Sequence, residues 1–206
     1  MTTFVRSIFA LVVIAAAAAT ASAQSVEASA PPPKHTGLFL RVTPGVAGSA
    51  AIAEQDGSDL TIKGGAGRFG LAVGYAVKPG LIITGELLGH AVLGPDLELA
   101  GETTRTDEDV VWGISYAGLG VNWYSASNLY VHGSLGPVMM SLETDDMPTA
   151  ETEIGFGSKL GVGYEWFVAH KVGLGVGLEL MTGRVDDHGT TWNLATLGLA
   201  FSATYN

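Results

Sequence analysis

The sequence Val172-Gly173-Leu174-Gly175-Val176-Gly177-Leu178-Glu179-Leu180 alternates large aliphatic residues with glycines and one glutamate. In a β-strand, where successive side chains point to opposite faces, this pattern makes one face apolar and leaves the other nearly empty. Glycine destabilises a strand interior by roughly 0.5–1 kcal/mol, so a face of glycines indicates that space is needed there. The lumen of a narrow β-barrel in a lipid bilayer has that requirement. We therefore expect these glycines to make room for bulkier lumen groups such as Arg41 and Lys159.

The same alternation recurs along the chain and predicts eight strands. The mean hydropathy is +0.33, yet no segment after the N-terminal region has 18 consecutive apolar residues, so transmembrane helices do not carry this hydrophobicity. In the fourth strand the large residues change phase, and a β-bulge or a twist near Ala117 would reconcile them. The predicted fold is all-β, an eight-stranded antiparallel up-and-down transmembrane β-barrel. Its strands are expected at residues 37–43, 66–77, 81–93, 112–123, 129–136, 154–166, 172–180 and 196–205.

The N-terminal 23 residues have the pattern of a secretory signal peptide. Arg6 precedes an apolar run, and a small-residue cleavage site ends at Ala23, before Gln24. The alternative, an N-terminal membrane anchor, is disfavoured because the apolar run is shorter than the roughly 20 residues that span a bilayer. We expect cleavage between Ala23 and Gln24, then a proline-containing periplasmic linker at residues 24–36 and an outer-membrane barrel domain at residues 37–206.

The connections between the predicted strands are of two kinds, tight turns and long acidic loops. Tight turns are expected near residues 78–80, 125–128 and 169–171, and long loops at about 48–65, 94–109, 141–153 and 183–190. Of the 20 carboxylates in the chain, 16 lie in the long loops. Short periplasmic turns and long external loops are typical of outer-membrane barrels, so both ends of the barrel wall are expected on the periplasmic side.

The acidic loops bear on the choice of partners. A net charge of −10 disfavours nucleic acid, whose binding needs a basic surface. The simplest interpretation is that the carboxylates solvate the loops. The alternative is that they bind divalent cations such as Ca²⁺ or Mg²⁺, which prefer oxygen ligands, although no loop has EF-hand spacing.

Charged residues also occur on the face assigned to the lumen. Three are basic and three are acidic: Arg41, Arg68, Lys159, Glu86, Glu165 and Glu179. Unpaired charges would be costly in a restricted lumen, so we predict a structural network of ion pairs that fills it. The alternative function for this network is an ion-selective or gated path.

Two histidines share the lumen phase with Glu86. His90 and His132 could form a metal or proton-relay site with that carboxylate, but their strands are not neighbours in an up-and-down barrel. We interpret them as structural groups and predict no metal, cofactor or catalytic site. The absence of cysteine also excludes disulfides and thiolate metal sites.

Aromatic residues gather near both ends of the predicted strands. Two aromatic belts at the membrane interfaces are characteristic of transmembrane barrels, whereas core packing would not segregate aromatics in this way. The direction of Trp112 and Trp192 is left open by the pattern. The predicted girdle consists of Phe69, Tyr75, Trp123, Phe156, Tyr164, Trp166, Phe201 and Tyr205.

The last strand, from Leu197 to Tyr205, alternates without interruption to the end of the chain. With its eight strands and glycine-rich inner faces, the chain resembles the small outer-membrane β-barrel superfamily of Gram-negative bacteria, over about residues 37–206. The terminal strand is similar to the recognition signal that this family presents to the barrel-insertion machinery, except that Asn206 follows the final aromatic residue. The resemblance implies a monomer in the outer membrane, in contact with lipid and lipopolysaccharide.

These observations favour a non-enzymatic barrel that presents acidic surface loops, with a role in envelope integrity, surface interaction or adhesion. No residues match the catalytic patterns of the lipid A deacylase or palmitoyltransferase barrels. The alternatives are a narrow channel or transporter for small solutes or ions, a lipid-modifying barrel enzyme, and a soluble lipocalin-like carrier. The last remains open because a period of two does not say which face is outside.

Overall fold

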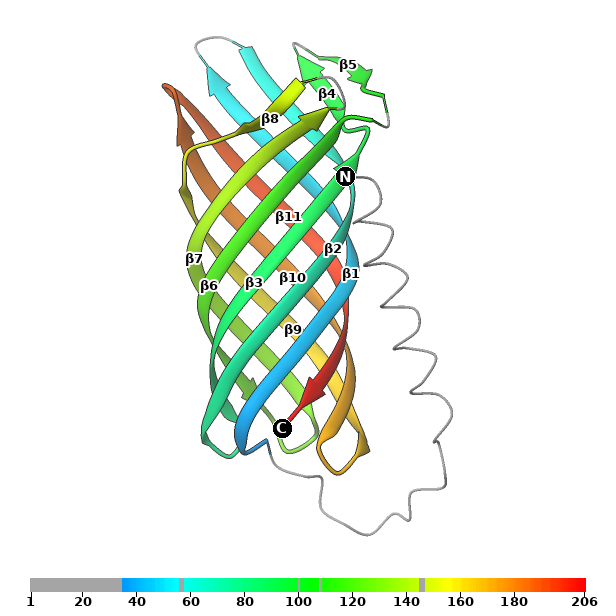
Figure 1. Ribbon diagram of the computed structural model, residues 1–206, viewed down its shortest axis with the longest axis vertical. Coiled ribbons are helices and arrows are strands. Elements are labelled where there is room, and N and C mark those ends of the chain that lie inside the picture. Colours follow the sequence, from blue (N-terminus) through cyan, green and yellow to red (C-terminus); the bar gives the residue numbers. More distant parts are fainter. Residues whose placement is uncertain (1–34, 56–57, 100, 108, 145–146) are drawn as a thin grey trace. The chain divides into compact units, whose positions relative to one another are not determined.

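The computed structural model describes residues 35–55, 58–99, 101–107, 109–144 and 147–206. The predicted signal peptide, its cleavage site and the linker up to residue 34 lie outside the described residues. Within the described ranges, eight long strands form the wall of a closed antiparallel barrel, which confirms the predicted fold class (Figure 1). They are β1 (Gly37–Gln55), β2 (Ser58–Lys78), β3 (Leu81–Leu93), β6 (Val111–Tyr124), β7 (Leu129–Thr144), β9 (Gly155–Ala169), β10 (Val172–Asp187) and β11 (Thr190–Tyr205).

Strand β1 closes the barrel by pairing on both sides. Leu40, for example, lies opposite Val73 of β2 and Tyr205 of β11. Closure leaves no edge strand in the wall, so each wall strand pairs with a neighbour on both sides, which is the condition for strands to cross a bilayer. Among the described residues, no helix is long and apolar enough to span a membrane.

The two ends of the barrel differ. Tight turns after β2, β6 and β9 lie at the same end as Asn206, and we call this the terminal end (Figure 1). The opposite end, here the loop end, carries three short strands: β4 (Asp96–Leu99), β5 (Glu102–Arg105) and β8 (Met147–Glu151). Strand β4 pairs with β2 and with β5, and β8 pairs with β7. The long connections after β3 and β7 therefore contain sheet structure of their own.

The glycines of β10 face the lumen, as predicted, but their neighbours differ from the prediction. A Cβ on Gly173 would collide with the Glu165 carboxylate, and a Cβ on Gly175 would lie 2.5 Å from the Ser202 hydroxyl oxygen. A Cβ on Gly177 would collide with the Tyr130 hydroxyl. The row makes room for bulkier lumen groups, as predicted, but the nearest ones are Glu165, Ser202 and Tyr130 in place of Arg41 and Lys159, because strand tilt and register bring these residues against it.

Three of the predicted long loops are mostly strand, since the one expected at 141–153 contains the end of β7 and all of β8, and the other two are continuations of the wall strands. The first was expected at residues 48–65, but β1 continues to Gln55 and β2 begins at Ser58, with the pairing unbroken up to those residues. The last was expected at 183–190, but β10 and β11 are joined through His188 and Gly189, whose φ angles are 49° and 86°. Two positive φ angles are typical of a type I′ hairpin turn. Glycine, alanine and polar residues in these segments hid the alternation that pairing preserves.

Strand β6 has a regular register with β3 from Val111 to Trp123, so the first of the two expected explanations, a β-bulge near Ala117, was wrong. The phase does not change: Trp112, Ile114 and Tyr116 point inward, and Leu119 and Trp123 point outward. The sequence pattern misled because large apolar residues fill part of the lumen as well as the outer wall.

A band of exposed apolar side chains surrounds the wall. It runs from Phe69 to Val77 on β2, from Val172 to Leu180 on β10 and from Leu197 to Tyr205 on β11, and each stretch is nine residues long. A tilted transmembrane β-strand needs about 9–11 residues. Beyond Leu180, β10 turns Thr182, Arg184 and Asp186 outward, so the wall continues past the band at the loop end.

Candidate functional site: the lumen and the loop end

The lumen has three layers, and the middle one is ionic. Lys159 Nζ lies 2.6 Å from Glu86 Oε2 and 3.7 Å from Glu179 Oε2, and Arg68 forms an ion pair with Glu179. All four side chains are buried. They alternate in charge as a chain of base, acid, base and acid, so each ion has an opposite charge in contact with it.

The remaining two predicted lumen charges form a separate pair nearer the terminal end. Arg41 donates from its Nη2 to Glu165 Oε2 at 3.2 Å, from Nη1 to Asn122 at 3.2 Å and from Nε to Thr204 at 3.2 Å. The same Glu165 oxygen accepts hydrogen bonds from Tyr124 and Thr204. The structure thus places all six predicted lumen charges inside the barrel, divided into a group of four and a group of two.

The terminal layer is aromatic and apolar. Phe39, Ile82, Tyr124 and Tyr130 are buried against one another. The Arg41 guanidinium carbon lies 4.6 Å from the centre of the Tyr130 ring and 5.0 Å from that of Phe39, so a cation–π contact links this layer to the ion pair.

The layer at the loop end is a hydrophobic core inside the barrel. Trp112 is 2% exposed and packs in a cluster with Met140, Met181 and Leu194. Trp192 is partly buried and packs against the same cluster. Both tryptophans therefore belong to the lumen, which resolves the direction that the sequence left open.

Space between these layers is small. A cavity of about 10 Å³ lies among Arg41, Glu86, His132, Lys159 and Glu179. A cavity needs roughly 10–15 Å³ to hold one water molecule. This cavity has room for about one water, far less than a hydrated solute needs.

His90 and His132 are buried in the lumen, on β3 and β7. The only group of metal-ligating side chains with closely spaced ligand atoms among the described residues lies elsewhere, at the loop end: Glu153, Asp187 and His188. Their candidate ligand atoms lie within 4.8 Å of one another. The structure therefore does not bring the two lumen histidines and Glu86 together as a metal site.

The loop end is rich in polar contacts between neighbouring strands. Lys63 Nζ of β2 lies 2.6 Å from Glu98 Oε2 of β4, and this carboxylate raises the pKa of Lys63. Thr191 donates a hydrogen bond to Asp186 Oδ1 at 2.6 Å, which lowers the pKa of that carboxyl group. Such contacts hold the extended strands together beyond the apolar band.

The eight residues predicted to form the aromatic girdle all lie exposed on the outer wall. Tyr164 and Trp166 stack with their ring centres 6.4 Å apart.

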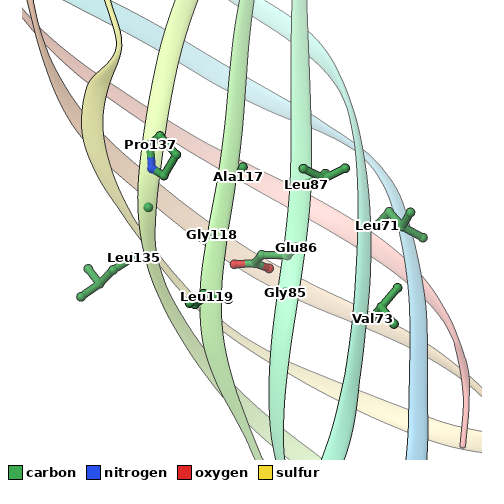
Figure 2. Close-up of a pocket in the computed structure, with 11 residues that line it drawn as sticks. Leu71, Val73, Gly85, Glu86, Leu87, Ala117, Gly118, Leu119, Leu135 and Pro137 are labelled. Carbon is green, nitrogen blue, oxygen red and sulfur yellow. The ribbon is translucent and has the colours of Figure 1, made fainter.

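Figure 2 shows a groove on this outer wall, of about 580 Å³, in which Leu71, Leu87 and Leu135 surround small residues. Pairing between β6 and β7 skips the positions from Ala117 to Gly118, opposite Gly136 and Pro137, and proline has no amide proton to donate there. Most residues that line the groove are apolar, and the lining also includes Glu86 of the ionic layer.

A closed barrel, an apolar outer band and a filled lumen define a transmembrane β-barrel. The family model described as the outer membrane protein beta-barrel domain matches residues 8–203. The chain belongs to this family and is an outer-membrane protein.

Several solved structures of outer-membrane and surface proteins are similar to this chain. Neisserial surface protein A (NspA) has a TM-score of 0.53 and 11% identity, and the match covers 82% of this chain and 97% of that one. OprG from Pseudomonas aeruginosa gives 0.49 and 11%, over 86% and 100% of the two chains. Ail, the attachment invasion locus protein of Yersinia pestis, gives 0.46 and 13%, over 82% and 99%. The likeness to NspA shows a shared fold, and no curated protein matches the chain significantly.

Sequence reasoning missed the residues that complete the terminal end. His35 was assigned to the linker, and Asn206 was seen as a departure from the family's terminal aromatic residue, yet their side chains contact each other at 2.9 Å. Asn122 and Thr204 lie in the lumen phase of their strands and could have been noted as partners of Arg41. Nothing local in the sequence indicates the contact between His35 and Asn206, which are 171 residues apart.

Proposed function

We propose that this protein is a non-enzymatic, non-conducting outer-membrane barrel that holds an acidic, strand-rich surface outside the cell, with a role in envelope integrity or surface interaction. The loop end is then extracellular and the terminal end periplasmic. The wall contacts membrane lipid and lipopolysaccharide as a monomer, and the β11 strand ending at Tyr205 serves the barrel-insertion machinery.

The observation that carries the proposal is the filling of the lumen. An apolar core around Trp112 and Met181 occupies one end, aromatic residues around Tyr124 occupy the other, and paired charges lie between them. A path for polar solutes would require water-sized space along the whole axis, and the ionic layer offers a cavity of only about 10 Å³. An eight-stranded barrel is only wide enough for its own side chains, which supports a plugged lumen.

The structure of the loop end supports a role in holding an acidic surface outside the cell. Strands β1, β2, β10 and β11 continue past the apolar band, and from Leu180 to Asp187 the β10 extension amounts to seven residues, or roughly 23 Å at about 3.3 Å per residue. Strands β4 and β5 add to the sheet beside β2, and all four residues of β5 are exposed. A rigid extended sheet with acidic side chains is suited to contact other surface molecules, with little ordering cost on binding.

The absence of conduction is tested first, in planar lipid bilayers. We expect the purified protein to give no stable conductance steps in concentrated KCl. Insertion of the unmodified protein is verified separately by its heat-modifiable migration on gels, so that an absence of conductance steps can be assigned to the filled lumen. Regular steps from the unmodified protein, abolished by Lys159→Met, would instead establish the channel as the function.

The exposure of the loop end at the cell surface is tested in cells. Protease added outside should cut a tag inserted after Leu99 but not one inserted at Ala126, in the turn between β6 and β7. Loss of the gene should increase the sensitivity of the cells to detergents or reduce their surface binding. When a variant barrel with β4 and β5 replaced by a short glycine-containing turn is expressed in the deletion strain, it should fail to restore surface binding. Unchanged lipid A masses in the deletion strain are expected, and a mass change would support the enzyme alternative.

A further inference from the structure

The side chain of His35 closes the terminal end of the barrel. It is only 3% exposed and stacks on the Tyr124 ring with 3.6 Å between ring centres. Its Nδ1 lies 2.9 Å from Asn206 Oδ1, and its backbone carbonyl accepts a hydrogen bond from the Gly80 amide at 3.2 Å. This single residue, two positions before β1, thus contacts the β2–β3 turn, β6 and Asn206.

Charged and titratable groups face His35 from three strands. Glu165 of β9 places its Oε1 3.6 Å from His35 Nε2, Arg41 of β1 pairs with the other oxygen of that carboxylate, and Tyr124 of β6 lies under the imidazole. The rings of Phe39 and Phe167 are the other aromatic neighbours. Asn206, the hydrogen-bond partner, carries no side-chain charge.

This arrangement is balanced in charge only when the imidazole is neutral. Glu165 is fully buried and already neutralised by Arg41, so a protonated His35 would add a second cation to a site with one anion. A net charge that is removed from water is costly unless it has a partner of its own. Burial has the largest influence on the pKa of His35 and lowers it, and it outweighs the opposing effects of Asn206 and Glu165.

We propose that His35 is a proton-released latch: neutral, it docks in the terminal end of the barrel, and protonated, it leaves and uncovers the Arg41–Glu165 pair. The direction of the pH dependence follows from the linkage between proton binding and docking. Because docking lowers the pKa of His35 below its ordinary value of 6.5, docking is fully favourable above that value and weakens as the pH falls through it. Each unit by which docking lowers the pKa weakens the docking constant about tenfold at low pH. The inference rests on the proposed topology, in which the terminal end is periplasmic, so acidification of the periplasm would then free His35 and Thr36.

The latch can be tested by spin labelling, because the chain contains no cysteine. A nitroxide on Thr36→Cys reports the mobility of the exposed residue beside His35, in the full-length mature protein reconstituted in phosphatidylcholine vesicles. We expect an immobile spectrum at about pH 8 and a growing mobile component towards about pH 5, with a midpoint that coincides with the titration of the His35 imidazole resonance, below 6.5. A label on Ala126→Cys, in the turn between β6 and β7, should not respond.

The matched variant is His35→Phe, which keeps a ring for stacking on Tyr124 but cannot take up a proton. In this variant the mobility of the nitroxide at residue 36 should be independent of pH. This result supports the proposal whether the phenyl ring is docked or free, because it assigns the pH response to the imidazole. The proposal is overturned if the unmodified protein shows no change in mobility, if the change occurs at a pH where His35 does not titrate, or if the response persists in His35→Phe.

Discussion

Lys159 Nζ lies 2.6 Å from Glu86 Oε2 and joins two strands that are not neighbours in the barrel wall. Lys159 is on β9 and Glu86 on β3, with β7 and β6 between them. The pair therefore crosses the lumen, and through the second contact of Lys159, to Glu179 of β10, it ties three strands together. A cross-lumen network of this kind stabilises one register of the closed barrel and leaves little room for solute.

The first prediction concerns this ion pair. Lys159→Met should lower the free energy of unfolding by about 3–5 kcal/mol, because it leaves buried Glu86 without its opposite charge. Urea titration in lipid vesicles, followed by tryptophan fluorescence, measures the loss. The double variant Lys159→Met with Glu86→Gln should recover part of it, since the amide is neutral. If the single and double variants were equally unstable, the pairing would not be the cause.

A second prediction concerns the glycine row of β10. Gly177→Ala should destabilise the barrel by about 1–3 kcal/mol, because its Cβ would collide with the Tyr130 hydroxyl and lie 3.1 Å from the Val162 carbonyl oxygen. Gly85→Ala is the control, since no atom lies within 4 Å of its Cβ position, and it should be neutral or stabilising by about 0.5–1 kcal/mol. Adding Tyr130→Phe to Gly177→Ala should relieve the collision. Equal effects at the two glycines in the unfolding titration would contradict this account.

The apolar band gives a third prediction, about membrane depth. Val176 is exposed at the centre of the β10 band, and Val176→Arg should cost about 2–4 kcal/mol of unfolding free energy in vesicles. Ala195 is exposed on β11 just beyond the band, and Ala195→Arg should cost only about 0–1 kcal/mol. A comparison of folding yields in thin and thick bilayers provides a further check. A similar penalty at both positions would show that the band extends further than proposed.

The fourth prediction is a pH dependence at the β10–β11 hairpin. The hydrogen bond from Thr191 lowers the pKa of Asp186 from its ordinary value of 3.8. The hydrogen bond favours the ionised carboxylate, so its contribution is present above 3.8 and is lost as the pH falls through the lowered pKa. Thr191→Val should raise the pKa of Asp186 towards 3.8, as measured by the carboxyl carbon resonance. No shift in that resonance midpoint would contradict the assignment.

Much of the fold could be predicted from local pattern. The phase of β10 and β11 follows from strict alternation, and the turns after β2, β6 and β9 follow from short polar breaks between alternating segments. The extent of β1 could not be predicted, because from Gly48 onward small residues on both faces conceal the period of two. The direction of Trp112 could not be predicted either, since an apolar lumen and an apolar outer wall have the same pattern.

The sequence by itself determined that this chain forms an eight-stranded barrel with an apolar outside, and that six charges lie in its lumen, because alternation is a property of consecutive residues. Only the tertiary structure decided which charges pair, how the lumen is divided into layers and what covers its terminal end. Glu86 meets Lys159 across 73 residues of sequence, and His35 meets Asn206 across 171. Such contacts depend on the register and tilt of strands that close on themselves, and no local pattern encodes them.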